Sequence, residues 1–130
     1  MPILQVMGLS QMDPGAEAGL IRALAQGVAS VSAMKVHPGL VTPFLLWSQI
    51  EPGQTDTIVV NFVGLLYRPE RTLEVLRQVA EQVTQVLTYW MNEYPDFFRD
   101  EVKIEVIIDP LCKPGPMEYI YYSIVWVKQK

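Results

Sequence analysis

The residue with the clearest chemical potential in this sequence is Pro2, which directly follows Met1. If Met1 is removed, the chain begins with a secondary amine, and an α-amino group has a pKa of about 7.7–8.0 in water. Burial or neighbouring cations lower that pKa, because they disfavour the charged form. A free N-terminal proline can therefore serve as a neutral base or nucleophile near neutral pH. The alternative is that Met1-Pro2 is an ordinary chain start without a chemical role.

Two arginines, Arg68 and Arg71, lie at the predicted start of the second helix. Cations are unfavourable at this end of a helix, since its free N–H groups carry partial positive charge. The placement therefore favours a partner anion, either a carboxylate of the chain itself or a bound ligand. The planar fork of an arginine also suits a carboxylate.

The other side chains that could do chemistry favour simpler roles. His37 lies in a His-Pro-Gly turn with no second His or Cys nearby, and Cys112 lies in a proline-rich loop without a partner His. A single Cys and a single His argue against a structural zinc site. The sequence contains neither a phosphate-binding loop nor a nucleophile elbow. We therefore expect no metal and no cofactor.

The hydrophobic pattern predicts five strands and two helices that would position these residues. Asp13-Pro14 is a helix start, because Asp accepts from free N–H groups and Pro suits the first helical position. The predicted helices run from this start to about Ala33, and from the segment 68–72 to Pro95 at the latest. The predicted strands are residues 2–9, 41–50, 57–67, 102–108 and 119–127.

The order β-α-β, β-α-β, β predicts an α/β fold in which two right-handed units form one mixed sheet, with both helices on one face. The segments 5–9 and 61–65 echo each other, which is consistent with two similar halves. Residues 57–67 and 119–127 are apolar on both faces, as in a sheet that is covered on both sides. Two helices cover only one face, so we expect the other face to meet another subunit.

Composition limits the remaining possibilities. With 130 residues, of which 50% are hydrophobic and 18% charged, the sequence predicts one folded domain comprising residues 1–130 rather than a disordered chain. A net charge of −4 and the absence of a basic cluster argue against nucleic-acid binding. The longest apolar stretches fall well short of the roughly 20 residues of a membrane helix, and no signal-peptide pattern is present. We therefore expect a cytoplasmic protein that binds neither nucleic acid nor membranes.

The element order, the strand that opens at Pro2, the surplus apolar sheet face and the chain length together resemble the tautomerase superfamily. This group includes oxalocrotonate tautomerase, carboxymethyl-hydroxymuconate isomerase, malonate semialdehyde decarboxylase and macrophage migration inhibitory factor. Met1-Pro2-Ile3 is the first specific motif. The second is Arg71-Thr72-Leu73-Glu74 with Arg77-Gln78, which is similar to the Arg-Ser-Leu-Glu-x-x-Arg-Gln segment of the carboxymethyl-hydroxymuconate isomerases.

Two weaker likenesses concern the cations. Arg68-Pro69 beside Arg71 resembles the paired arginines that open this helix in the decarboxylase branch. Lys35 falls near the lysine of the inhibitory-factor branch, by its offset alone. The segment 41–47 departs from the pattern, because it lacks the arginine that many members carry there.

The resemblance implies a cofactor-free tautomerase or isomerase that forms a homo-oligomer, a trimer as in the long-chain members. Pro2 would be the catalytic base, and Arg71 with Arg68 or Lys35 would bind the carboxylate of a small keto or enol acid. Decarboxylation and dehalogenation remain open as alternative reactions. So does a non-catalytic member that keeps the fold as a binding or structural protein. A retained Met1 would make the proline nitrogen an amide and abolish the proline mechanism.

Overall fold

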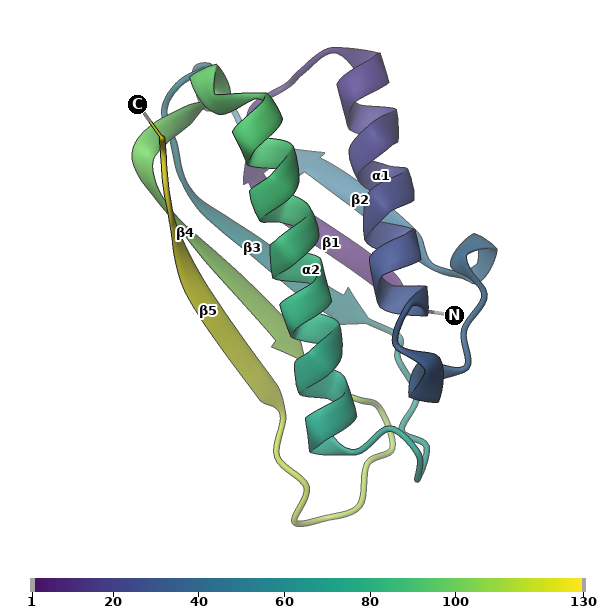
Figure 1. Cartoon of the computed structure of the whole chain (residues 1–130). Helices are drawn as coiled ribbons and strands as arrows, with labels where there is room; N and C mark the ends of the chain where they lie inside the picture. The colour runs from purple at the N-terminus through teal and green to yellow at the C-terminus, as the bar shows by residue number, and fades with distance from the viewer. Residues whose placement is uncertain (1, 130) are drawn as a thin grey trace.

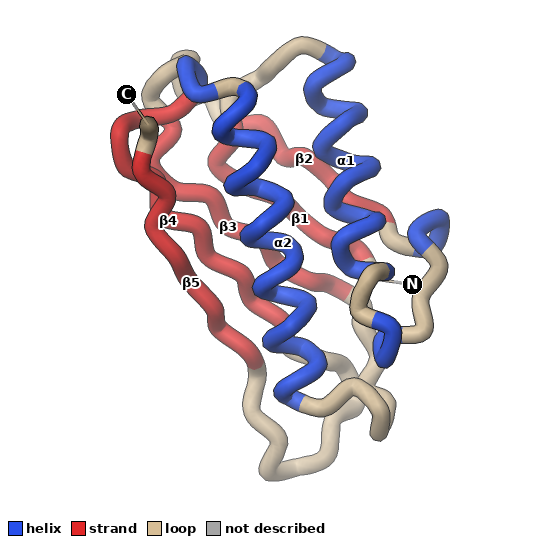
Figure 2. The backbone as a smooth tube through the Cα atoms, viewed as in Figure 1, coloured by secondary structure: helices blue, strands red, loops and turns tan. Residues whose placement is uncertain are grey.

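The computed structural model describes residues 2–129 and confirms the predicted α/β fold. Figure 1 shows both helices side by side on one face of the sheet, and Figure 2 shows the two layers by secondary structure. The helices are α1, Pro14–Ala29, and α2, Leu73–Glu93. The strands are β1, Ile3–Leu9; β2, Thr42–Trp47; β3, Thr55–Val63; β4, Phe98–Ile108; and β5, Ile120–Val127.

The sheet consists of two similar units joined at its centre. The strand order is β2-β1-β3-β4-β5, in which β1 with β2 and β3 with β4 are parallel pairs, and the other neighbours are antiparallel. Each helix connects one parallel pair. At the junction Gln5 pairs with Asn61, and the glycines Gly8 and Gly64 both have positive φ angles, of 101° and 76°. The echo between the segments 5–9 and 61–65 is therefore a structural one.

The core lies between the helices and the sheet. Leu20 of α1 and Leu76 of α2 are fully buried, which confirms the predicted apolar stripe of the second helix. At the other end of α2, the ring of Trp90 packs against Phe98, and Phe98 packs against Trp126, with ring centroids 5.9 and 5.8 Å apart. This contact ties α2 to both β4 and β5.

The first helix ends earlier than predicted. α1 stops at Ala29 rather than near Ala33, and the hydroxyl of Ser30 donates to the carbonyl of Gly27 at 2.7 Å. Val31 is extended and buried, and a separate 3₁₀ turn follows at Ser32–Met34. The helix was predicted too long because Val31 is apolar. It is apolar because it packs into the core from the turn region after α1, not because it is helical.

The third strand is also shifted from its predicted range of 57–67. β3 spans Thr55–Val63, and Gly64 turns the chain out of the strand in a left-handed conformation. Leu65 is buried although it lies beyond the end of β3. The apolar run therefore continues past the strand, because the connection to α2 also packs into the core. The other strand ends lie within four residues of the predicted ones.

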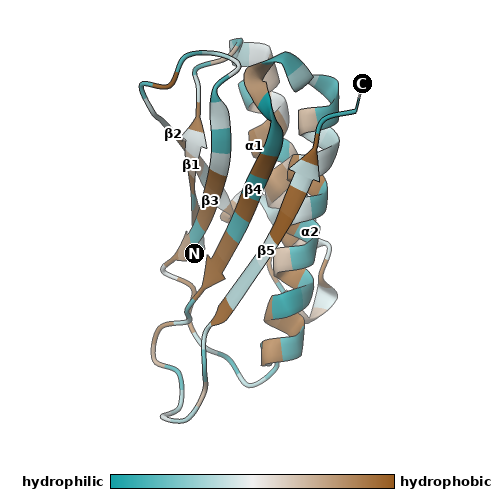
Figure 3. Cartoon of the chain, turned by 90° about the vertical axis from the view of Figure 1, so that its left-hand side faces the viewer, coloured by the Kyte–Doolittle hydropathy of each residue, from teal (hydrophilic) through white to brown (hydrophobic). Residues whose placement is uncertain are grey.

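The second face of the sheet carries no helix, as the sequence predicted. Figure 3 shows this side with the strands in front and brown, hydrophobic segments on β3, β4 and β5. We call it the open face. Its large exposed apolar side chains are 37–60% exposed, and they are Phe44, Leu46, Val63, Tyr121, Val125 and Val127. None of the helices in residues 2–129 is long and apolar enough to cross a membrane.

Candidate functional site

All four site residues expected from the sequence line one cavity. Its volume is about 200 Å³, and Pro2, Lys35, Arg68 and Arg71 are part of its wall. The rest of the wall is apolar or backbone, and consists of Val36, Leu40, Gly64, Leu65 and Leu66. The two specific motifs of the sequence are thereby brought together in space.

The topology of the sheet explains this convergence. Pro2 is buried just before β1, and its carbonyl accepts the N–H of Thr42 at the start of β2, at 3.0 Å. The connection from α1 to β2, which carries Lys35, therefore arrives beside Pro2. β1 and β3 are antiparallel, with Ile3 opposite Val63, so the connection from β3 to α2 leaves at the same end. In Figure 1 the N-terminus, the turns after α1 and the β3–α2 connection lie at this end, to the lower right.

Arg71 is the most buried of the three cations. Its side chain is only 6% exposed, and its Nη1 and Nη2 donate to the carbonyls of Leu66 and Met34 at 2.9 and 3.0 Å. Its Nε is buried without a hydrogen-bond partner in the part of the chain that the structure describes. The sequence led us to expect a carboxylate or a ligand beside this arginine; the observed partners are backbone carbonyls.

The charge of Arg71 is not neutralised by the protein. Within residues 2–129, Arg71 forms no ion pair with a carboxylate. Burial lowers the pKa of its guanidinium, the positive charge of Arg68 lowers it further, and Glu70 opposes the shift. An arginine remains charged nonetheless, since its ordinary pKa lies far above neutral pH. The region around the cavity is therefore positive, and an anion entering it would be stabilised.

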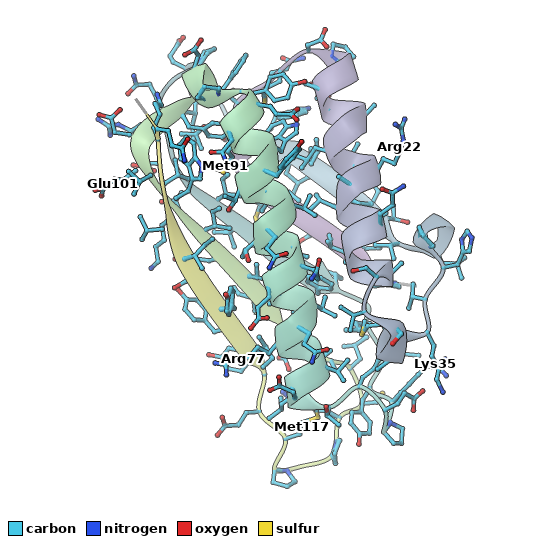
Figure 4. All side chains as sticks on the ribbon, in the orientation of Figure 1. Arg22, Lys35, Arg77, Met91, Glu101 and Met117 are labelled. Atoms are coloured by element: carbon cyan, nitrogen blue, oxygen red, sulfur yellow. The ribbon has the colours of Figure 1, made fainter. Side chains whose placement is uncertain are left out.

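Arg68 and Lys35 are exposed residues of the same wall. Lys35 follows the 3₁₀ turn in a left-handed conformation with a φ of 51°, and Figure 4 shows its side chain at the surface of this loop. Neither cation is ion-paired with a carboxylate among the described residues. Both are therefore available to a negatively charged ligand.

The cavity wall also limits which group could move a proton. The described lining contains no His, Cys, Asp or Glu. His37 lies outside it, and its Nδ1 accepts the N–H of Gly39 at 3.0 Å. Cys112 is exposed in its loop. No group of three metal-ligating side chains occurs among residues 2–129. If Pro2 is the first residue of the chain, its nitrogen is the candidate base in this wall.

Sequence reasoning missed the apolar half of the site. Leu66 was assigned to a strand, and Val36 and Leu40 carried no sequence signal for a role in a site. The carbonyls of Met34 and Leu66 could not have been identified either, since every residue type has one. A prediction of the Gly64 turn would have placed Leu66 in the connection and so beside Arg68.

Comparison with known proteins supports the fold but gives no close relative. No protein-family model matches the sequence, and neither does any curated protein. Among solved structures, the chain is similar to native fused 4-OT, with a TM-score of 0.57, 16% identity and coverage of 87% of this chain and 91% of that one. It is also similar to 5-carboxymethyl-2-hydroxymuconate delta-isomerase, with a TM-score of 0.56, 14% identity and coverage of 88% and 87%.

A third similar structure is described as an asymmetric trimer of wild-type fused 4-OT, with a TM-score of 0.56, 17% identity and coverage of 87% and 90%. These are structures of tautomerase superfamily members. The chain therefore has the tautomerase fold, which confirms at the level of the fold the resemblance stated from the sequence.

Proposed function

We propose that this protein is a cofactor-independent tautomerase or isomerase that acts on a small keto or enol carboxylic acid, with the N-terminal Pro2 as catalytic base. One observation carries the proposal: Pro2 shares a small cavity with three cations and an apolar wall, and the described lining contains no carboxylate. A neutral base and a positive field are what proton transfer next to a carbonyl requires.

The proposed reaction needs no other reagent. In the enol-to-keto direction, the Pro2 nitrogen takes the enol hydroxyl proton and then delivers a proton to the neighbouring carbon. A C–H bond replaces an O–H bond, and all atoms are retained. The cations bind the substrate carboxylate and stabilise the negative charge that develops on the enolate oxygen. They also favour an unprotonated amine, because like charges disfavour its charged form.

We also propose that the protein is a homo-oligomer, a trimer, in which the open face is covered by other copies of the chain. The support is the row of exposed apolar side chains on this face, since large apolar patches mark interaction surfaces. Two fused 4-OT structures that share the fold are themselves described as trimers. A stable monomer of 14.8 kDa at micromolar concentration, in sedimentation or light scattering, would reject this part.

A second candidate function is a non-catalytic oligomer that binds small acids. The observation that favours it is β2, whose residues Thr42–Trp47 include no arginine, in contrast to many members of the superfamily that the chain resembles. The intact mass of the native protein separates the two candidates at once. A retained Met1 makes the proline nitrogen an amide, which has no basic lone pair.

The direct test is enol-to-keto conversion of a phenylpyruvate-type and a hydroxymuconate-type enol acid by the protein from which Met1 has been removed, which we call the Met-free protein. We expect a rate above that of the buffer, and a decrease of about 10²–10⁴-fold in a variant with one extra residue before Pro2, as for the loss of a general base. Arg77→Ala is the matched control, because Arg77 is exposed on α2 and does not line the cavity. Undiminished activity in the extended variant would end the proline mechanism, and an inactive Met-free protein would favour the binding role.

A further inference from the structure

The side chain of Arg71 is engaged by the protein itself. Two of its nitrogens donate to the carbonyls of Met34 and Leu66, and it is almost completely withdrawn from solvent. We infer that Arg71 is a positioning residue: it holds together the two loops that carry Lys35 and Arg68, and these two exposed cations contact the substrate carboxylate. The inference rests on the proposed function for the nature of the ligand.

The hydrogen bonds of Arg71 reach both loops that contribute cations to the cavity wall. Met34 directly precedes Lys35, so the bond to its carbonyl fixes the loop after α1. Leu66 lies two residues before Arg68, so the bond to its carbonyl fixes the connection after β3. The backbone N–H of Arg71 also donates to the carbonyl of Arg68 at 2.9 Å and closes that turn. One residue therefore determines where both exposed cations stand.

Nη1 and Nη2 of Arg71 each already bind a loop carbonyl, and its third nitrogen is withdrawn from a ligand as well. Its Nε is buried and does not reach solvent, so a carboxylate could meet it only if the wall opened. Lys35 and Arg68 line the same cavity, are exposed, and form no ion pair with a described carboxylate. The direct contacts belong to these two residues, while the charge of Arg71 acts through space.

Replacement of Arg71 by lysine separates charge from position. The ammonium of Arg71→Lys keeps the positive charge, but it cannot reproduce the rigid fork that spans two carbonyls. Arg77→Lys is the matched control on α2. Figure 4 shows Arg77 on the side of α2 that faces β5, away from Lys35.

The first measurement is amide hydrogen exchange of the full chain, without any ligand. We call the two hydrogen bonds from Arg71 to the carbonyls of Met34 and Leu66 the carbonyl clamp. We expect exchange in the segments 35–41 and 65–71 to become at least tenfold faster in Arg71→Lys, because the loops open more easily without this clamp. Exchange in the centre of α2 should stay unchanged, and Arg77→Lys should match the wild type throughout. Unchanged exchange in both loops of Arg71→Lys would overturn the inference.

The second measurement is the affinity for oxalate, a small carboxylate probe, by calorimetry. We expect Lys35→Met, Arg68→Met and Arg71→Lys each to weaken binding about tenfold, as for the loss of one charged hydrogen bond. Because Arg71 acts through Lys35 and Arg68, adding Arg71→Lys to the double variant Lys35→Met/Arg68→Met should weaken binding little further, well short of the product of the separate losses. Losses that multiply would mean that Arg71 contacts oxalate itself, and would overturn the inference. So would wild-type affinity in both Lys35→Met and Arg68→Met.

The two measurements distinguish this inference from the proposed function. Coupled oxalate binding in a Met-free protein that catalyses no enol-to-keto conversion would reject the proposed reaction and support the clamp. If the wild type binds no oxalate, the contacts assigned to Lys35 and Arg68 are wrong, and the exchange rates still decide whether Arg71 holds the loops together.

Discussion

The two halves of the chain repeat the same local structure around the end of the first strand and the start of the helix. Gly8, the last residue but one of β1, and Gly64, the first residue after β3, both have positive φ angles. Each connection then ends on a side chain that caps the next helix. Asp13 accepts the N–H groups of Gly15 and Ala16, and Thr72 accepts that of Val75. A glycine at the end of the strand and an N-cap residue before the helix therefore occur in both halves.

The two connections differ in charge. The segment from Gly64 to Thr72 carries Arg68 and Arg71, whereas the segment from Gly8 to Asp13 contains no basic residue. Of the two connections, only the second therefore places arginines beside the cavity. The first connection shows that the turn and the helix cap form without arginines.

The largest expected effect is on the free energy of unfolding, and it concerns a buried leucine that the two helices have in common. Leu20 and Leu76 lie at the same distance beyond Gly8 and Gly64, on the two helices, and both are fully buried. We expect Leu20→Ala and Leu76→Ala each to lower the free energy of unfolding by about 2–5 kcal/mol. Chemical denaturation measures both. A loss below about 0.5 kcal/mol in either variant is typical of a surface site and would break the equivalence of the two helices.

Replacement of the two glycines, in contrast, should lower the stability by different amounts. A Cβ atom at Gly8 would collide with the carbonyl of Thr57, in addition to its left-handed strain at a φ of 101°. Gly8→Ala should therefore cost about 2–4 kcal/mol, from strain and overpacking together. Gly64→Ala should cost about 1–2 kcal/mol from the strain of its φ of 76°. Equal losses in denaturant midpoints at unchanged slope would show that the collision relaxes at no cost, and would leave φ as the shared constraint.

The fold could be predicted because its signals lie in side chains that repeat. The capping pair Asp13-Pro14, the stripe that includes Leu76 and the apolar strands each follow a short-range rule. The predicted element boundaries are wrong where a buried residue lies outside a helix or strand. Val31 and Leu65 are apolar because they pack into the core from turns, and periodicity reads such residues as helix or strand.

The site was predictable only in part. Pro2 stands out by its chemistry, and Arg68 and Arg71 by their unfavourable place at a helix start. Lys35 came from a resemblance in offset, since nothing in its own surroundings in the sequence marks it. That all four share a cavity depends on the antiparallel contact of β1 with β3, a long-range pairing that local patterns do not specify. The carbonyl clamp on Arg71 had no sequence signal at all.

The open face provides a further contrast between the halves. On the side of the first half, β2 presents Phe44 and Leu46, which are 50% and 43% exposed. On the side of the second half, β5 also presents apolar side chains such as Val125, and β4 adds the ion pair Lys103–Glu105, with a nitrogen–oxygen distance of 2.9 Å. Exposed apolar area favours burial against any apolar surface. An ion pair favours only those partners that leave its two charges paired.

The smallest expected effect is the pH dependence of this ion pair. The hydrogen bond from Lys103 lowers the pKa of Glu105, and the hydrogen bonds to Glu105 and Tyr121 raise the pKa of Lys103. A lowered carboxyl pKa adds stability above the unfolded value of about 4.3, and this stability is lost as the pH falls through the folded pKa. A raised lysine pKa adds stability below its unfolded value of about 10.4, and this is lost as the pH rises through the folded pKa.

The difference in Tm between the wild type and Glu105→Gln should therefore be constant from about pH 5 to 9 and shrink below about pH 4. Its size should be small for a single exposed pair and larger if other copies cover the open face, because burial removes the screening by solvent. A Tm difference that grows as the pH falls would show that the charge of Glu105 destabilises the folded protein, and the contrast between the two halves of the open face would then be one of shape alone.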